Sequence, residues 1–297
     1  MTFRRDGMAV AISRKPIQNE KNNRPTALLT ALKVALLPKT RIDALSGDPN
    51  FMTSLARGLS VIQCFSHATS FLTVSQISQA TGFSRASVRR CLYTLSKLGL
   101  ANSEDGAHFT LLPRVLTLGH SYISSMPLSK VAQPVLDRLS QVLRESCSIA
   151  MLDGPDVIHV AHANISRVLA VDLSMGSRLP AIYTSMGRAL LAHLPPRDLE
   201  VLLARAEFFP HTKHSVTDIK GLRLSLDVVR RTGYALVDQE LEMGLCALAV
   251  PLRNAAGRVI AALNVGAPVQ RASAQNMVTK FVPQLQEAAQ ELSMLLK

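Results

Sequence analysis

The sequence has few cysteines, no membrane-length apolar run and no secretion signal. The four cysteines are far apart and show no paired spacing, which excludes a disulfide framework and a cysteine zinc site. The longest apolar stretch, residues 27–37, is too short to span a bilayer and is interrupted by Lys33. The N-terminus carries arginines but no apolar core followed by a cleavage site. These absences predict a cytoplasmic protein with reduced thiols and no membrane partner.

Signatures of cofactor and catalytic chemistry are also missing. No glycine-rich nucleotide motif is present, so we expect no cofactor. His159 and His162 lie on a predicted strand with an odd separation, which should place them on opposite faces and exclude a shared metal. The string Tyr183 to Gly187 lacks the leading glycine of a nucleophile elbow. We therefore predict no metal and no catalytic residue. The alternative is a small-molecule hydrolase with a helical accessory domain, using Ser185 or Cys246 as its nucleophile.

Acidic residues are outnumbered by basic ones, 21 to 33, which gives a formal net charge of +12. Such an excess favours polyanionic partners. Residues 1–50 mix Arg, Lys, Asn and Pro, and they predict a basic, mostly disordered extension. A chain of 297 residues, 47% of them hydrophobic, is long enough for two domains with separate cores.

Residues 72–99 predict two helices that meet at a tight turn. Thr73 and Gln76 have the spacing of a capping box, Gly82 suits a left-handed helix end, and Ser84 begins a second helix. Apolar residues recur at helical spacing along one face of that second helix, and basic residues lie off it. This pattern is typical of a helix-turn-helix whose second helix lies in the DNA major groove. An ordinary helical hairpin with a solvated basic side is the alternative.

The flanking segments extend this unit to a winged helix-turn-helix over residues 51–113. A helix is expected from about residue 51 to 67, and a small hairpin follows residue 100 with Glu104 and Asp105 at its tip. An acidic wing tip is a poor surface for phosphate, so we expect the second helix to make most DNA contacts. The predicted DNA-binding residues are Thr73, Ser84, Arg85, Ser87, Arg89 and Arg90.

Residues 114–126 predict a connector helix, and residues 127–297 a strand-rich domain. The apolar side of the connector needs a cover, for which a second subunit is a natural candidate. Two apolar strands joined by the turn at 254–257 form a clear hairpin, and helices occur in separate runs. The chain is therefore expected to be a two-domain α+β protein with a mainly antiparallel sheet.

A binding site is expected where a helix begins at Thr184 or Ser185. The first backbone N–H groups of a helix lack intrahelical partners and favour a carboxylate. Gly187 permits close backbone approach, while Arg178 and Arg188 supply positive charge. A plain helix cap with structural arginines is an equally good interpretation.

Three segments carry a specific resemblance: PAIYTSMGRALLA at 180–192, VDQELEMGLCALAVPL at 237–252 and GRVIAALNVGAP at 257–268. With the order of winged helix, connector and α/β domain, they resemble the IclR family of bacterial transcription regulators. The strings LARGLSVIQCF, ESCSIAMLDG, TSMGR and DQELE are similar to the branch that controls the β-ketoadipate pathway of aromatic catabolism. The likeness runs from about Phe51 to the C-terminus.

The resemblance implies a homodimer or dimer of dimers on palindromic double-stranded promoter DNA, and a GAF-like effector domain. It implies a small organic acid as effector, such as β-ketoadipate, protocatechuate or 4-hydroxybenzoate. The implied effector-binding residues are Ser185, Met186, Gly187, Asp238, Cys246 and Ala247. Where the family commonly has Gly-Leu-Arg followed by Ser or Cys, this chain has Gly-Leu-Cys-Ala at 244–247. Activation and repression are both compatible with this architecture.

Overall fold

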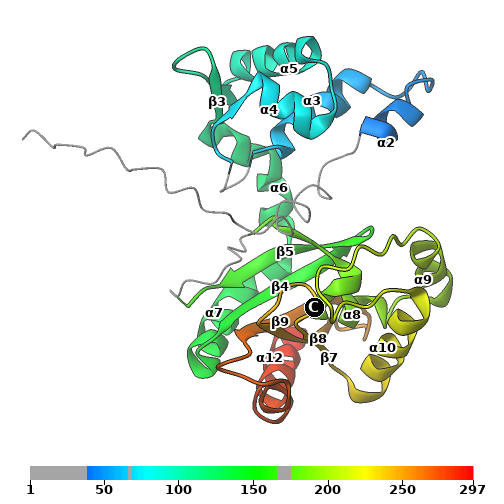
Figure 1. Ribbon diagram of the computed structural model, residues 1–297. Coiled ribbons are helices and arrows are strands. Elements are labelled where there is room, and N and C mark those ends of the chain that lie inside the picture. Colours follow the sequence, from blue (N-terminus) through cyan, green and yellow to red (C-terminus); the bar gives the residue numbers. More distant parts are fainter. Residues whose placement is uncertain (1–38, 66–68, 166–174, 297) are drawn as a thin grey trace, which may run out of the picture.

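A computed structural model describes residues 39–65, 69–165 and 175–296. It shows two folded units joined by a helical connector, with the N-terminal unit at the top of Figure 1 and the larger C-terminal unit below it. Residues 1–38, most of the predicted extension, lie outside the described residues. No helix among the described residues is long and apolar enough to cross a membrane.

The N-terminal unit is a winged helix-turn-helix. Its helices are α2 (Lys39–Ala44), α3 (Thr53–Gln63), α4 (Val74–Thr81) and α5 (Arg85–Lys97). Its strands are β1 (Leu72–Thr73), β2 (Ala101–Asn102) and β3 (His108–Leu111), in the order β1-β3-β2. Side chains from α3, α4 and α5 bury a common core that includes Val61, Ile77 and Leu92. This confirms the predicted class of the unit.

Helix α2 was not predicted, because residues 1–50 were expected to be mostly disordered. Ile42 on α2 is only 1% exposed and belongs to the same core as α3 and α5. The folded unit therefore includes residues before position 51. Its sequence, KTRIDA, has too few apolar residues to show a helical period, so only the tertiary contact reveals it.

The connector consists of the 3-10 turn η1 (Pro113–Leu116) and helix α6 (Thr117–Ser125). Leu116, Leu118 and Tyr122 are all more than half exposed. A proline then begins the 17-residue helix α7 (Pro127–Leu143), whose left-handed end at Arg144 leads directly into the sheet.

The C-terminal unit is built on a six-stranded antiparallel sheet of order β6-β5-β4-β9-β8-β7. The strands are β4 (Ser146–Asp153), β5 (Asp156–Ala163), β6 (Arg178–Pro180), β7 (Ala235–Asp238), β8 (Leu245–Arg253) and β9 (Val259–Pro268). The turn at 254–257 joins β8 to β9 as predicted.

Helices cover both faces of this sheet. One face packs on α7 and on α12 (Val282–Leu295), which follows α11 (Ala274–Asn276) and a π-helical turn at Met277–Phe281. The other face packs on the turn η2 (Ala181–Tyr183) and on α8 (Ser185–Leu191), α9 (Pro196–Leu203) and α10 (Ile219–Thr232). Figure 1 shows α7 and α12 on one side of the sheet and α8 to α10 on the other. The sheet therefore separates two cores.

Candidate functional sites

The helix ends around α4 and α5 have the predicted caps. Thr73 Oγ1 accepts from the N–H of Gln76 at 3.2 Å, and Gln76 Oε1 accepts from the N–H of Thr73 at 2.8 Å. Gly82 has φ 73°, and Ser84 Oγ accepts from the N–H of Ser87 at 3.2 Å. These bonds fix the angle at which α5 leaves the turn.

Helix α5 divides into an apolar and a basic face. Of the apolar residues that recur at helical spacing along α5, Val88, Leu92 and Leu95 are buried, whereas Leu98 is 54% exposed and lies outside the core. The basic residues Arg85, Arg89 and Arg90 are exposed. None of them takes part in an ion pair with another described residue. Their guanidinium groups are therefore free to contact phosphates or base edges.

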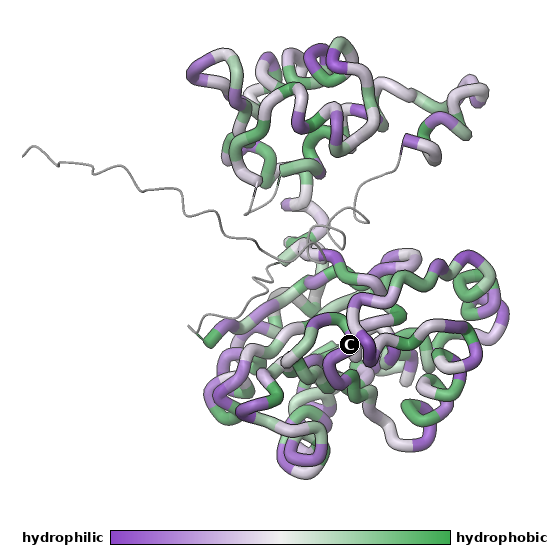
Figure 2. The backbone as a smooth tube through the Cα atoms, in the orientation of Figure 1, coloured by the Kyte–Doolittle hydropathy of each residue, from purple (hydrophilic) through white to green (hydrophobic). Residues whose placement is uncertain are grey.

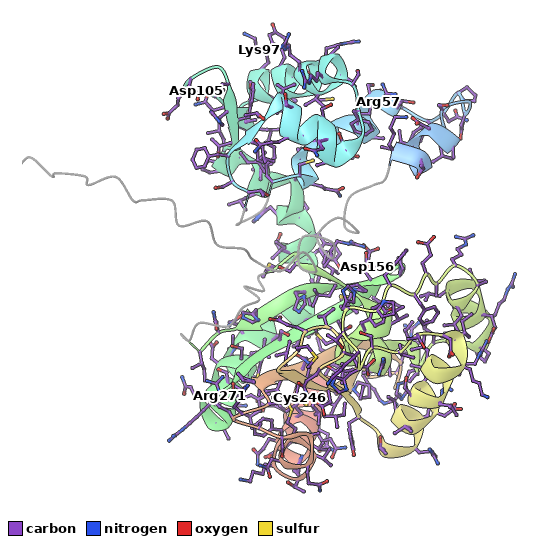
Figure 3. All side chains as sticks on the ribbon, in the orientation of Figure 1. Arg57, Lys97, Asp105, Asp156, Cys246 and Arg271 are labelled. Atoms are coloured by element: carbon purple, nitrogen blue, oxygen red, sulfur yellow. The ribbon has the colours of Figure 1, made fainter. Side chains whose placement is uncertain are left out.

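Tyr93 extends the basic face and was missed in the sequence. It is 64% exposed, and Lys97 Nζ lies 5.4 Å from the centroid of its ring. The four-residue spacing of Arg85, Arg89, Tyr93 and Lys97 along a helix could have revealed this row. Figure 3 places Lys97 at the end of the N-terminal unit that is remote from the C-terminal unit.

The wing between β2 and β3 is acidic and hydrophilic (Figure 2). Asp105 Oδ1 accepts from the N–H groups of His108 at 2.7 Å and Ala107 at 2.9 Å, and Oδ2 lies 2.6 Å from His108 Nδ1. These bonds, with His108 as the main partner, lower the pKa of Asp105 well below its usual range. A carboxylate that stays ionised at the wing tip supports the expectation that α5 makes the main DNA contact.

The start of α8 lies over the centre of the large sheet. Thr184 Oγ1 caps the helix by accepting from the N–H of Gly187 at 3.1 Å. Ser185 is 1% exposed, and its Oγ accepts from Asn264 Nδ2 at 2.8 Å. Ser148 Oγ in turn donates to Asn264 Oδ1 at 3.4 Å. A buried polar network thus connects β4, β9 and the helix start.

Ser148 and Asn264 were missed as site residues. Each is a polar residue within an otherwise apolar strand, CSIAML for β4 and VIAALNVG for β9. A buried polar side chain is the informative exception in such a pattern. Pairing with a residue 116 positions away could not be predicted from spacing, but the polar interruptions themselves could have marked both positions.

Both arginines that were expected to supply positive charge to the site form ion pairs with carboxylates. Arg178 pairs with Asp153 and, at 3.2 Å, with Asp156. Arg188 makes two bonds of 2.6 Å to the carboxylate of Glu240, and its Nε donates to the carbonyl of Ile182 at 3.0 Å. The structural interpretation of these arginines is therefore the correct one.

Cys246 and Asp238 do not join the site at α8. Cys246 is fully buried in the core that faces α7 and α12, the opposite face of the sheet from Ser185. Asp238 lies directly across from Cys246 in the β7–β8 pairing, hence on that same face, and its side chain is exposed. Ala247 is the neighbour whose side chain faces α8, because successive strand residues alternate between faces.

The prediction that His159 and His162 lie on opposite faces is wrong. His159 pairs with Ala150 and His162 with Ser148, but Ile149 pairs with Ala161. A β-bulge thus inserts one extra residue between the two histidines and returns both to the face that carries α8. The described residues nevertheless contain no cluster of three metal-ligating side chains.

His159 presents an unused hydrogen-bond acceptor on this face. It is 1% exposed, and its Nδ1 lies 3.1 Å from the carbonyl of Ser177, which requires a proton on Nδ1. Nε2 is buried without a partner among the described residues. Burial, with a smaller effect of His162, lowers the pKa of His159 to about 4. The neutral ring can therefore accept a hydrogen bond from a hydroxyl group.

This histidine predicts an acid-sensitive fold. Between pH 6.5 and 4 the unfolded chain binds a proton at this residue that the folded chain does not, so the free energy of unfolding falls as the pH falls. One such histidine lowers it by about 2 kcal/mol from pH 7 to pH 5. Urea unfolding of His159→Leu should show a weaker pH dependence than the wild type. The exposed loop variant His214→Leu is the control, and an identical pH dependence in the wild type and His159→Leu would contradict the assignment.

The arrangement does not equip Ser185 or Cys246 for catalysis. Ser185 Oγ is bonded to an amide, which is not a general base. Burial, together with the nearby Asp238 carboxylate, raises the pKa of Cys246 to about 11, so its thiol is protonated at neutral pH. The geometry fits a binding domain attached to a DNA-binding domain.

Comparisons with known families agree with this arrangement. Residues 54–105 match the IclR helix-turn-helix domain, and residues 120–294 match the bacterial transcriptional regulator IclR C-terminal domain. Together these matches include most of both folded units and the second half of the connector.

Individual relatives are also regulators and not enzymes. The chain is 47% identical over 275 residues to the Pca regulon regulatory protein of Pseudomonas putida, covering 92% of this chain and 94% of that protein. It is 36% identical over 251 residues to the p-hydroxybenzoate hydroxylase transcriptional activator of Acinetobacter baylyi, covering 82% and 91%. An IclR homologue from Microbacterium hydrocarbonoxydans, solved in complex with 4-hydroxybenzoate, matches with a TM-score of 0.70 and 27% identity, covering 82% and 98%. The chain belongs to the IclR family of bacterial transcriptional regulators.

Proposed function

We propose that the protein regulates genes of aromatic-acid catabolism by the β-ketoadipate pathway, as a cytoplasmic homodimer or dimer of dimers that responds to a small organic acid. The observation that carries its DNA-binding role is the exposed basic face of α5, whose arginines form no ion pair with any residue that the structure describes. Caps at Thr73 and Ser84 hold this helix-turn-helix. The pathway is supported by the 47% identity to a Pca regulon regulator.

The effector is proposed to bind between the start of α8 and the sheet. Ser148, Ser185 and Asn264 supply polar groups there, and the short side chain of Ala247 lies on the same face of the sheet. His159 Nε2 lies on the same face and has no hydrogen-bond partner among the described residues, so it could accept a hydrogen bond from the hydroxyl group of a hydroxybenzoate. A relative solved with 4-hydroxybenzoate supports this ligand class, with protocatechuate and β-ketoadipate as the other members to be tested.

The connector is proposed to carry the response. Leu118 and Tyr122, one helical turn apart on α6, expose a short apolar stripe that a second subunit would cover. An effector changes the spacing of the two α5 helices only if it binds one dimer arrangement more tightly than the other. This spacing determines which half-sites the dimer can occupy.

A promoter-binding assay tests the proposal. We expect the full chain to prefer a promoter fragment of its own catabolic genes over random DNA, and an aromatic acid to change that affinity. Arg89→Ala should weaken promoter binding by about 5- to 150-fold, the range for a lost contact to guanine. Arg197→Ala, which removes an exposed cation from α9, is the matched control. No preference for the promoter, with or without the acids, would refute the proposal.

A further inference from the structure

The large sheet divides at one end, between β4 and β9. These strands pair from Ser146 with Gly266 to Ala150 with Ala262, and their pairing stops there. Beyond that point, Met151–Asp153 pair only with β5, and the first residues of β9 pair only with β8. The two strands leave a fork whose inner edges have no strand between them.

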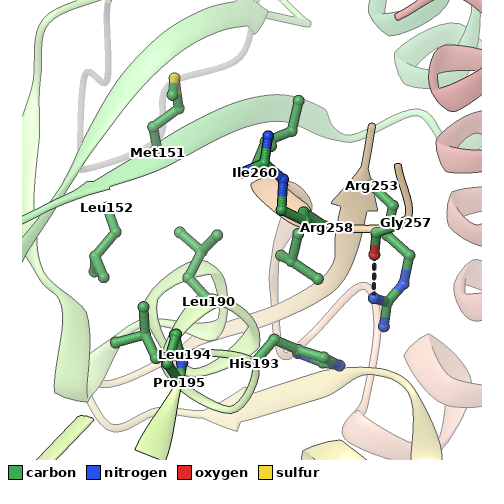
Figure 4. Close-up of a pocket in the computed structure, with 11 residues that line it drawn as sticks. Met151, Leu152, Leu190, His193, Leu194, Pro195, Arg253, Gly257, Arg258 and Ile260 are labelled. Carbon is green, nitrogen blue, oxygen red and sulfur yellow. Dashed lines mark hydrogen bonds between the residues drawn. The ribbon is translucent and has the colours of Figure 1, made fainter. Parts of the chain in front are cut away.

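A cavity of about 360 Å³ occupies this fork, with the last turn of α8 beneath it (Figure 4). Its size is within the roughly 300–1,000 Å³ range of small-molecule sites. Leu152 and Ile260 line it from the two strands, and Leu190 and Leu194 line it from the α8 side. The cavity lies at the opposite end of α8 from Ser185, so it is separate from the proposed effector site.

The lining combines an apolar interior with a positively charged rim. Arg253 and Arg258 both line the cavity, and none of its eleven lining residues is acidic. Arg253 uses one N–H on the carbonyl of Gly257 at 2.9 Å, as the dashed line in Figure 4 shows. Among the described residues, neither arginine has a carboxylate partner.

The position of His193 agrees with a positive potential in the cavity. Burial is the largest cause that lowers the pKa of His193, and the charges of Arg253 and Arg230 lower it further. Arg230 pairs with Asp227 at 2.6 Å and donates to the carbonyl of Ala192, so of these two arginines only Arg253 lacks a carboxylate partner among the described residues. An anion with an apolar body complements this surface.

We propose that the fork is a second ligand site, which binds a small aromatic monocarboxylate with its ring among the leucines and its carboxylate toward the positive charge of Arg253 and Arg258. Met151 connects the site to the connector, because the Tyr122 hydroxyl on α6 donates to Met151 Sδ at 3.8 Å and Met151 also lines the cavity. A ligand in the fork therefore acts on α6 through a route that does not involve the start of α8. The inference does not depend on the proposed pathway.

Equilibrium dialysis of labelled benzoate against the full chain tests the site. We expect saturable binding, and the variant Arg253→Gln/Arg258→Gln should raise the Kd of a fork-bound benzoate at least about tenfold, because the charge-assisted contact with its carboxylate is lost. Arg231→Gln removes an exposed cation from the end of α10 and should leave binding unchanged. Leu194→Trp fills the cavity without changing the charge and should reduce binding to the same extent.

The outcomes separate this site from the one at α8. Two benzoates per protomer in the wild type and one in the arginine variant would place a ligand at each end of α8. An arginine variant that binds benzoate as the wild type does would overturn the second site. The second site would also be overturned if the arginine variant lost benzoate binding and Leu194→Trp did not. Promoter binding by the arginine variant should persist, so failure here would not be confused with failure of the regulator function.

Discussion

Replacing Gly187 by alanine is expected to lower the free energy of unfolding of the C-terminal unit by more than about 4 kcal/mol. A Cβ atom at this position would lie 2.0 Å from the carbonyl oxygen of Ala181 and 2.3 Å from its Cα. Both atoms are backbone, and the N–H of Ala181 is itself bonded to the carbonyl of Pro155 at 2.9 Å. Ala181 cannot move away from this Cβ without breaking its hydrogen bond to the turn between β4 and β5.

Gly58 provides the matched control for this variant. It also lies inside a helix, α3, but a Cβ there would meet nothing within 4 Å. Gly58→Ala should therefore stabilise the protein by about 0.5–1 kcal/mol through helix propensity alone. Urea unfolding followed by circular dichroism measures both. A Gly187→Ala protein as stable as the wild type would show that α8 does not pack on Ala181 as described.

The sequence was most informative where structure depends on near neighbours. Caps at Thr73 and Ser84 and the left-handed Gly82 involve residues at most four positions apart, so spacing alone predicted them. The hairpin turn at 254–257 was predicted for the same reason. Helix α2 was missed because its stability comes from the burial of Ile42 against α3 and α5, and its short sequence contains no comparable signal.

The face of the sheet on which each side chain lies was predicted less well. Simple alternation placed His159 and His162 on opposite faces, and one inserted residue in β5 reversed that result. A bulge is determined by the partner strand, which a single segment does not specify. Cys246 was assigned to the effector site from a resemblance. Its position in β8, however, directs its side chain into the core that faces α7 and α12.

The partners of the site residues were the least predictable feature. Arg188 pairs with a carboxylate 52 positions away, and Asn264 bonds to a serine 79 positions away. Residue type showed that Arg188 carries charge near α8, but only the fold shows that Glu240 neutralises it. The basic face of α5 was recognised because its arginines and its lack of local carboxylates are both visible within one helix, although the row that continues to Tyr93 was not.

The second large effect is expected at Glu240. The side chain of Arg188 is 5% exposed, and Glu240 accepts both of its terminal N–H groups at 2.6 Å. Glu240 Oε2 also accepts from the N–H of Val216 at 2.9 Å. Glu240→Ala leaves a buried guanidinium without a counter-charge and should lower the free energy of unfolding by about 3–5 kcal/mol.

Comparison with an exposed pair of the same geometry isolates the effect of burial. Arg223 also makes two short bonds to a carboxylate, that of Glu200, but the two side chains are 44% and 57% exposed to water. Glu200→Ala should therefore leave the urea midpoint almost unchanged, since solvent screens the exposed pair. Arg188→Met/Glu240→Leu removes both buried charges and should recover much of the stability lost in Glu240→Ala. If Glu240→Ala and Glu200→Ala lowered the free energy of unfolding equally little, water would have to reach Arg188. The buried pair could then not be what holds the loop after β7 against α8.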